Sequence, residues 1–202
     1  MKINPGFVLS SAAVAAMFLP AAAQISTPPA NPPARINPRK ENQQDRIANG
    51  VASGQLTAGE TANLERKESN LNQEENLMRS ADGGKLTGAD RKVLNQQQNQ
   101  LSRQIYQDKH NAAVQNTNPK SEVGKRAENQ QDRIAQGIKS GQLTAGEAAN
   151  LEHTEAGIHR EVRNDRAANG GQLTQQERAQ VNRQQNHVSR QIYRDKHNGR
   201  RS

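Results

Sequence analysis

The chain contains no cysteine and no tryptophan, and its aromatic residues are two phenylalanines and two tyrosines. Without cysteine it has no disulfide scaffold, no thiolate metal ligand and no thiol nucleophile. It also lacks a glycine-rich phosphate loop and a serine in a nucleophile elbow. No stretch alternates apolar and polar residues as a half-buried strand would. We therefore predict a helical protein that is not an enzyme and holds no resident cofactor.

The first 23 residues have the pattern of a secretory signal peptide. Lys2 is followed by an apolar run at 7–19, and small residues at 21–23 suit cleavage before Gln24. The run is too short to span a bilayer, because a spanning helix needs about 20 apolar residues. A membrane anchor and a buried helix are the alternatives. Export without cysteine predicts a periplasmic or secreted bacterial protein.

The rest of the chain is organised as a repeat. Residues 24–40 carry five prolines and little to bury, which predicts an extended linker. The segment 41–111 then recurs as 128–198, with about 60% of the positions identical and no gap. A repeat of this quality outweighs any local propensity. Residues 112–127 are predicted to be a second linker, and residues 199–202 a basic tail.

A short signature occurs twice in each copy: glycine, a polar residue, leucine, threonine and, three residues after the threonine, an acid. Threonine followed by an acid at this spacing forms a capping box, which begins a helix. The glycines upstream, such as Gly50 and Gly54, are predicted to take the positive φ that ends the preceding helix. The four signature acids are Glu60, Asp90, Glu147 and Glu177.

These patterns predict an all-α fold, a tandem duplication of a three-helix unit built from helix-loop-helix junctions. Apolar residues at helical spacing place the helices near 39–49, 58–80 and 88–111, and again 87 residues further on. Each copy has few large apolar residues, so their burial barely offsets the loss of chain entropy. We expect the copies to pack together, to dimerise or to become ordered with a ligand. A partly disordered chain is the alternative.

The signature also has the spacing of a calcium-binding loop. With Asn49 as position 1, Gly54 falls at position 6, Leu56 at position 8 and Glu60 at position 12. The helix-loop-helix pairs therefore resemble EF-hands, and the resemblance implies that the four signature acids are remnants of the calcium ligand at position 12. The loops depart from that family because none has a carboxylate at position 1, 3 or 5. Helix capping is the other interpretation of these acids.

The formal net charge of +8 indicates either an anionic partner or a solvated helical surface. In the predicted compartment, proteins and anionic polymers of the cell envelope are available, whereas nucleic acid is not expected. We predict a structural or binding module of the cell envelope, with a degenerate EF-hand-like calcium-binding or ion-sensing protein as the alternative. A homo-oligomer is left open, and no membrane span is expected after cleavage.

Few other residues suggest chemistry. His110 and His197 occupy matching helix ends, where a cation complements the helix dipole; a transition-metal site is the alternative. Arginines stand near both tyrosines in the matching segments 102–106 and 189–193. Such a pair either binds a sugar ring or a phosphate, or is a tyrosine packed under an arginine stem. The other repeated acids are expected to be exposed and to form i,i+4 pairs.

Overall fold

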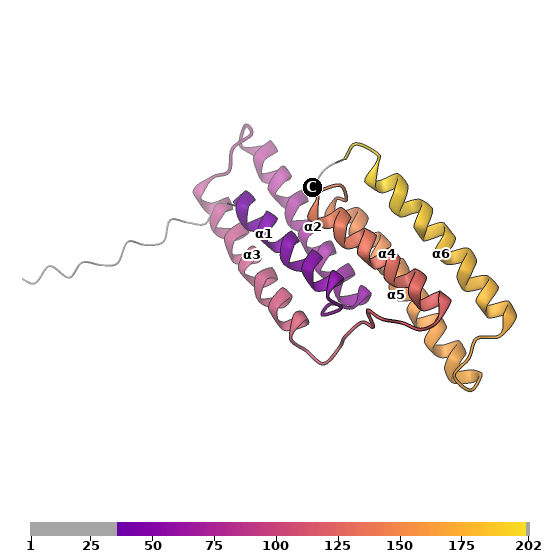
Figure 1. Cartoon of the computed structure of the whole chain (residues 1–202). Coiled ribbons are helices and arrows are strands. Elements are labelled where there is room, and N and C mark those ends of the chain that lie inside the picture. The colour runs from indigo at the N-terminus through magenta and orange to yellow at the C-terminus, as the bar shows by residue number, and fades with distance from the viewer. Residues whose placement is uncertain (1–35, 201–202) are drawn as a thin grey trace, which may run out of the picture. The chain divides into compact units, whose positions relative to one another are not determined.

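The computed structural model describes residues 36–200, and these residues form six α-helices (Figure 1). The helices are α1 (Ile36–Ala52), α2 (Ala58–Ala81), α3 (Gly88–Lys109), α4 (Glu122–Lys139), α5 (Ala145–Ala168) and α6 (Gln175–Lys196). This range contains no strand, so the all-α prediction is confirmed. None of the six helices is long and apolar enough to cross a membrane. The predicted signal peptide, residues 1–23, lies outside the described residues.

Four helices begin where the signatures place them. Helices α2 and α5 start directly after Thr57 and Thr144, and α3 and α6 start after Thr87 and Thr174. Each threonine has an extended backbone, and its hydroxyl accepts the amide hydrogen of the acid three residues later. The capping box therefore decides where these helices begin.

The first helix of each copy is longer than predicted. Helix α1 begins at Ile36, inside the first predicted linker, and α4 begins at Glu122, inside the second. Pro38 is tolerated because it lies in the first turn of α1, where a backbone amide has no helical acceptor. Ser121 starts α4 early by accepting the Gly124 amide at 3.2 Å. Both linkers therefore end sooner than the composition indicated.

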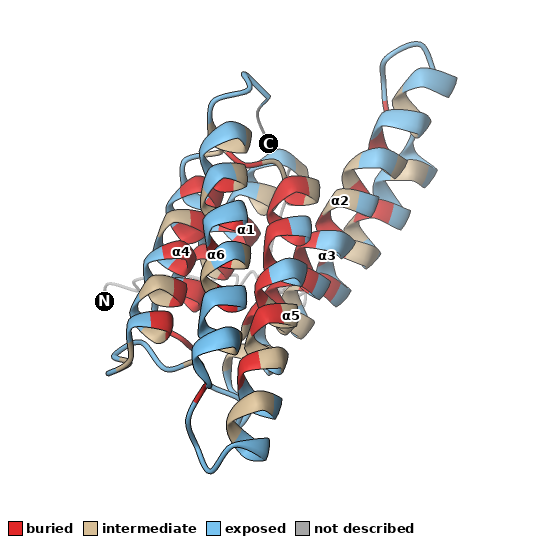
Figure 2. Ribbon diagram, turned by 90° about the vertical axis from the view of Figure 1, so that its right-hand side faces the viewer, coloured by how far each residue is buried: buried red, intermediate tan, exposed pale blue. Residues whose placement is uncertain are grey.

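The most extensive helix contacts join the two halves of the chain. Helix α2 packs along α5 and α1 along α4, while α3 covers α1 and α2, and α6 covers α4 and α5. Figure 1 shows α3 and α6 on opposite sides of the bundle. The buried residues (Figure 2) form one core, to which Ile47, Leu64, Ile134 and Leu151 contribute. Each copy therefore completes its thin core with apolar residues from the other.

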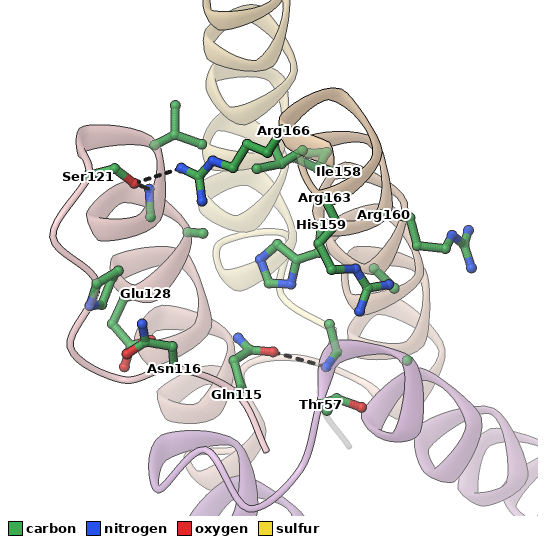
Figure 3. Close-up of a pocket in the computed structure, with 18 of the residues that line it drawn as sticks. Thr57, Gln115, Asn116, Ser121, Glu128, Ile158, His159, Arg160, Arg163 and Arg166 are labelled. Atoms are coloured by element: carbon green, nitrogen blue, oxygen red, sulfur yellow. Dashed lines mark hydrogen bonds between the residues drawn. The ribbon is translucent and has the colours of Figure 1, made fainter. Parts of the chain in front are cut away.

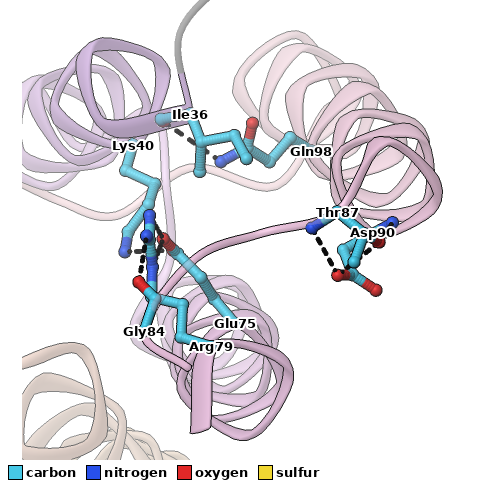
Figure 4. A network of polar contacts seen from close by, with 8 residues as sticks. All are labelled: Ile36, Lys40, Glu75, Arg79, Gly84, Thr87, Asp90 and Gln98. Atoms are coloured by element: carbon cyan, nitrogen blue, oxygen red, sulfur yellow. Dashed lines mark hydrogen bonds and ion pairs between the residues drawn. The ribbon is translucent and has the colours of Figure 1, made fainter. Parts of the chain in front are cut away.

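Glutamines of the repeated Asn-Gln-Gln motif enter this core. Gln43 Nε2 donates to the Gln98 carbonyl at 2.7 Å, and Gln130 Nε2 donates to the Gln185 carbonyl at 2.8 Å. Gln98 Nε2 in turn donates to the Ile36 carbonyl at 3.3 Å (Figure 4). These bonds tie α1 to α3 and α4 to α6, because a buried amide needs a partner.

Two glycines before each long helix are needed for different reasons. Gly54 has a φ of 69° and ends the turn after α1, as predicted. Gly50 lies inside α1, and a Cβ atom there would stand 2.6 Å from Leu56 Cδ1. The prediction of a positive φ is therefore wrong for Gly50, whose role is to leave room for Leu56. Gly137 and Leu143 repeat this contact at the same 2.6 Å.

Candidate functional site

The four signature acids, which are the metal candidates of the sequence, all close capping boxes. Glu60 Oε2 accepts the Thr57 amide at 2.9 Å and the Thr57 hydroxyl at 2.7 Å. Its other oxygen accepts a bond from Asn111 at 2.6 Å, which ties the end of α3 to the start of α2. The other three acids accept the amide of their own cap threonine; they are Asp90, Glu147 and Glu177.

Hydrogen bonds favour the ionised form of Asp90, Glu147 and Glu177 by lowering their pKa values. Burial raises the pKa of Glu147, but bonds from Thr144 and Asn198 outweigh it and hold the pKa below its ordinary value. Bonds from the Thr174 backbone and hydroxyl lower the pKa of Glu177. Within residues 36–200, no three His, Cys, Asp or Glu side chains are grouped as metal ligands would be. The capping role therefore accounts for the geometry of all four acids.

Because capping occupies these carboxylates, we expect calcium to leave the stability of the protein unchanged. A ligand present at a hundred times its Kd would stabilise the fold by about 2.7 kcal/mol. Thermal melts followed by far-UV circular dichroism, with millimolar calcium and with chelator, should therefore coincide. A rise of several degrees with calcium would mean that the EF-hand-like loops bind the ion, and ion sensing would become the leading function.

Four other acids lie in the core, although the sequence placed them on the surface. They are Glu65 and Glu68 of α2 and Glu152 and Glu155 of α5. Each is at most 1% exposed, and none forms an ion pair within residues 36–200. Gln44 Nε2 donates to Glu65 Oε2 at 3.2 Å, and the second copy repeats this bond. Glu68 and Glu155 have no hydrogen-bond partner among the described residues. The prediction of exposed i,i+4 pairs is therefore wrong for these four.

Burial makes these carboxyl groups weak acids. It raises the pKa of Glu65 and Glu155 to about 8 and that of Glu68 to about 7. The pKa of Glu152 is raised well above its ordinary value, first by burial and then by repulsion from Glu155 and Glu65. A carboxyl in an apolar core stays protonated because ionisation without water is costly. The formal charge of +8 counts all four as anions, so it understates the positive charge in mild acid.

A cleft of about 520 Å³ opens beside α5. It lies between the start of α2, the linker after α3, the start of α4 and one face of α5 (Figure 3). Gln115 holds the linker in place: its backbone amide donates to the Gly54 carbonyl at 2.9 Å, and its Oε1 accepts the Ala58 amide at 3.2 Å. The cleft therefore depends on the segment between the copies, which occurs once in the chain.

Basic side chains of α5 dominate one wall of the cleft; they are His159, Arg160, Arg163 and Arg166. In Figure 3, His159 and Arg166 point into the cleft, whereas Arg160 points away from it. Arg166 donates to the Ser121 hydroxyl at 3.1 Å. None of the three arginines forms an ion pair with another described residue. Glu128 is the one acid among the lining residues, so the cleft is positive.

This positive wall belongs to the second copy alone. Arg166 corresponds to Arg79 of the first copy. Arg79 Nη2 forms an ion pair with Glu75 Oε1 at 2.7 Å (Figure 4). Val162 stands at the position equivalent to Glu75, so Arg166 has lost that carboxylate. Two further cations replace neutral amides: Arg160 and Arg163 stand where the first copy has Gln73 and Asn76. His159 stands where the first copy has Asn72 and adds no charge at pH 7. The second copy has therefore gained positive charge that the fold does not neutralise.

Two of the five histidines end helices, and a third lines the cleft. His110 and His197 end α3 and α6, and their Nδ1 atoms lie 2.7 and 2.6 Å from the carbonyls of Tyr106 and Tyr193. They therefore serve as helix ends, as the sequence indicated. Burial and the nearby Arg163 lower the pKa of His159, so its ring is neutral at pH 7. A neutral imidazole both donates and accepts a hydrogen bond.

Sequence reasoning missed the cleft and the buried acids. The signal was present in the two aligned copies, where α5 carries basic residues in place of the amides of α2. Comparison with known proteins finds no matching family model, no matching curated protein and no matching solved structure. The functional inference therefore rests on the geometry of the cleft.

Proposed function

We propose that the protein is a non-enzymatic binding module of the bacterial cell envelope, and that it holds an anionic polymer in the cleft beside α5. The observation that carries this proposal is the unneutralised wall of α5, where Arg166 lacks the partner that Arg79 has in Glu75. A guanidinium group presents a planar fork of donors that matches a carboxylate or a phosphate. The volume of about 520 Å³ is that of an ordinary ligand pocket.

The bundle fits a tandem duplication of one three-helix unit. The Gln43–Gln98 bond of the first copy reappears as the Gln130–Gln185 bond of the second, and all four capping boxes have the same form. Both copies also keep the glycine that makes room for a leucine. Duplication leaves one copy free to change its surface while the shared core is maintained. The changed face of α5 follows this pattern.

A protein partner has less support from the surface. The exposed large apolar residues of the described range belong to four separate segments; they are Leu77, Val93, Tyr106, Val114 and Tyr193. Protein interfaces usually bury a contiguous apolar centre. The signature acids give the calcium-sensing alternative little support, since each is engaged at a helix cap. An anionic polymer therefore agrees best with the charge and the exported location predicted from the sequence.

The test is a comparison of two double variants with the same loss of charge. Arg163→Gln with Arg166→Gln removes charge at the cleft, whereas Arg66→Gln with Lys67→Gln removes it from exposed positions of α2. Binding to immobilised polyphosphate should weaken about tenfold or more in the cleft variant, because a bond to a charged group contributes about 1.5–3 kcal/mol. The control variant should bind nearly as the wild type. Equal weakening in both variants, or no binding at low salt, would refute the proposal.

A further inference from the structure

A second basic surface lies on α4 and α6. It is a shallow depression of about 480 Å³ lined by Arg133 of α4 and by residues from the last turns of α6, namely Ser189, Arg190, Tyr193 and Arg194. We call it the Tyr193 face. None of its residues lines the cleft beside α5. It is therefore a separate site.

The fold does not account for the tyrosine at the centre of this face. Tyr193 is 61% exposed, and its counterpart Tyr106 is 60% exposed. Burial of an aromatic ring stabilises a protein, but a ring left this open contributes little in that way. These are also the only two aromatic residues between positions 24 and 202. An exposed aromatic at the same place in both copies indicates a surface that contacts a ligand.

The ring of Tyr193 is held in one orientation before any ligand arrives. It stacks on His197, with ring centroids 4.3 Å apart and an interplanar angle of 27°. The His197 ring is itself anchored, because its Nδ1 lies 2.6 Å from the Tyr193 carbonyl. A side chain that is already ordered loses less entropy on binding. The stack therefore prepares Tyr193 as a flat platform.

The arginines around this platform are held by few carboxylates, although the charge of Arg194 acts on the neighbouring Asp195. Arg133 reaches across from α4 to α6, where its two terminal nitrogens donate to the Ser189 hydroxyl at 2.6 Å and to the Ser189 carbonyl at 3.1 Å. Arg190 and Arg194 lie one helical turn apart, and such a pair of like charges destabilises a helix. Neither forms an ion pair within the described part of the chain. An anion bound between them would remove that repulsion.

We infer that the Tyr193 face binds an acidic sugar residue of a polysaccharide, with the pyranose ring on Tyr193 and the carboxylate on Arg190 and Arg194. The inference rests on the proposed function for the choice of an envelope polymer, and it specifies that polymer as an acidic polysaccharide. The site is a different one from the cleft. A sugar ring has an apolar C–H face that packs on an aromatic ring, and its carboxylate matches a guanidinium fork. A simple phosphate would use the arginines and leave the exposed tyrosine without a role.

The first copy supplies an internal control. Arg46 reaches Ser102 as Arg133 reaches Ser189, and Tyr106 stacks on its own histidine at 4.1 Å. The residue equivalent to Arg194 is Gln107, so this copy has one cation fewer beside the ring. We expect one strong uronate site per chain, on the second copy.

Calorimetric titration of the protein with trigalacturonate tests the inference. Tyr193→Ala should lower the affinity at least tenfold, whereas Tyr193→Phe, which keeps the ring, should bind as the wild type. Arg190→Gln with Arg194→Gln should weaken binding and reduce its dependence on salt. Tyr106→Ala should leave the strong site intact. Because Tyr193 is exposed, far-UV circular dichroism should show all these variants folded.

Other outcomes would overturn the inference. Binding of the methyl-esterified, neutral trisaccharide as tight as that of trigalacturonate would show that charge has no role. Inorganic phosphate binding equally well would show a simple anion site. Trigalacturonate binding that is unaffected by Tyr193→Ala but lost in the Arg163→Gln and Arg166→Gln variant would place the sugar in the cleft instead. That last result would leave the proposed function standing and remove only the Tyr193 face.

Discussion

The free energy of unfolding should fall by several kcal/mol between about pH 5 and about pH 9. The folded-state pKa values of Glu65 and Glu155 are about 8 and that of Glu68 is about 7, against 4.5 for an unperturbed glutamate. The folded protein therefore binds more protons than the unfolded chain in this interval, and stability then decreases as the pH rises. The contribution is complete below pH 4.5 and is lost as the pH passes through 7 to 8.

The size of the effect follows from the number of acids. A rise of about three pKa units in one carboxyl corresponds to about 4 kcal/mol, while a typical domain is stable by about 5–15 kcal/mol. Three such groups, Glu65, Glu68 and Glu155, ionised in place would cost about 12 kcal/mol, which is most of that stability. We therefore expect the α2–α5 contact, which contains these acids, to loosen as they lose their protons. His159 acts in the opposite sense, because burial lowers its pKa and its share of stability is lost as the pH falls below 6.5.

Urea unfolding at a series of pH values, followed by far-UV circular dichroism, measures how the free energy of unfolding depends on pH. Replacing Glu68 and Glu155 by glutamine, which cannot ionise, should flatten the alkaline decline. Glu75→Gln on the same helix is the control: burial raises the pKa of Glu75, but Arg79 and Lys40 outweigh it and lower that pKa. This variant should lose stability at neutral pH and keep the alkaline decline. Equal stability of the wild type at both ends of the range would contradict the buried, protonated state.

Gly137→Ala should destabilise the protein by about 1–3 kcal/mol, although alanine is the better helix former by about 1 kcal/mol. The added Cβ atom would stand 2.6 Å from Leu143 Cδ1 and 2.7 Å from its Cγ. Leu143 is fully buried, so it has little room to move. Steric overlap should therefore outweigh the gain in helix propensity. Gly50→Ala should behave in the same way against Leu56.

Gly157 provides the matched control. It lies inside α5, and a Cβ atom there would meet nothing within 4 Å. Gly157→Ala should therefore stabilise the protein by up to about 1 kcal/mol through helix propensity alone. Thermal melts of the two variants should shift in opposite directions. If both shifted upward, Leu143 would have to repack without cost, and the assigned role of Gly137 would be incorrect.

The helices were predictable to the extent that their signals are local. A threonine and an acid three residues later specify where a helix starts, and α2, α3, α5 and α6 begin after Thr57, Thr87, Thr144 and Thr174. The early start of α1 was missed because proline composition masked a permitted first turn at Pro38, and that of α4 because the Ser121 cap was not recognised. The four acids proposed as metal ligands were found from their spacing to the threonine, which is also local. The structure shows each of them in a capping box with that threonine.

The candidate site was less predictable, because it depends on which helix faces meet. Glu65 and Glu68 resemble ordinary surface acids until α5 covers that face of α2. The basic residues of α5 resemble a solvated surface until the linker, held by Gln115, closes the other side of the cleft. Neither relation follows from spacing along one helix.

The sequence alone determined the helical class, the four capped helix starts and the repeat of 41–111 as 128–198. Capping and apolar periodicity act over a few residues, and the repeat is visible when the two segments are compared. Only the tertiary structure decided that the two copies share one core, that four glutamates of α2 and α5 are buried, and that one cleft is positive. Burial and charge neutralisation depend on atoms far apart in the chain, so they exist only once the helices have packed.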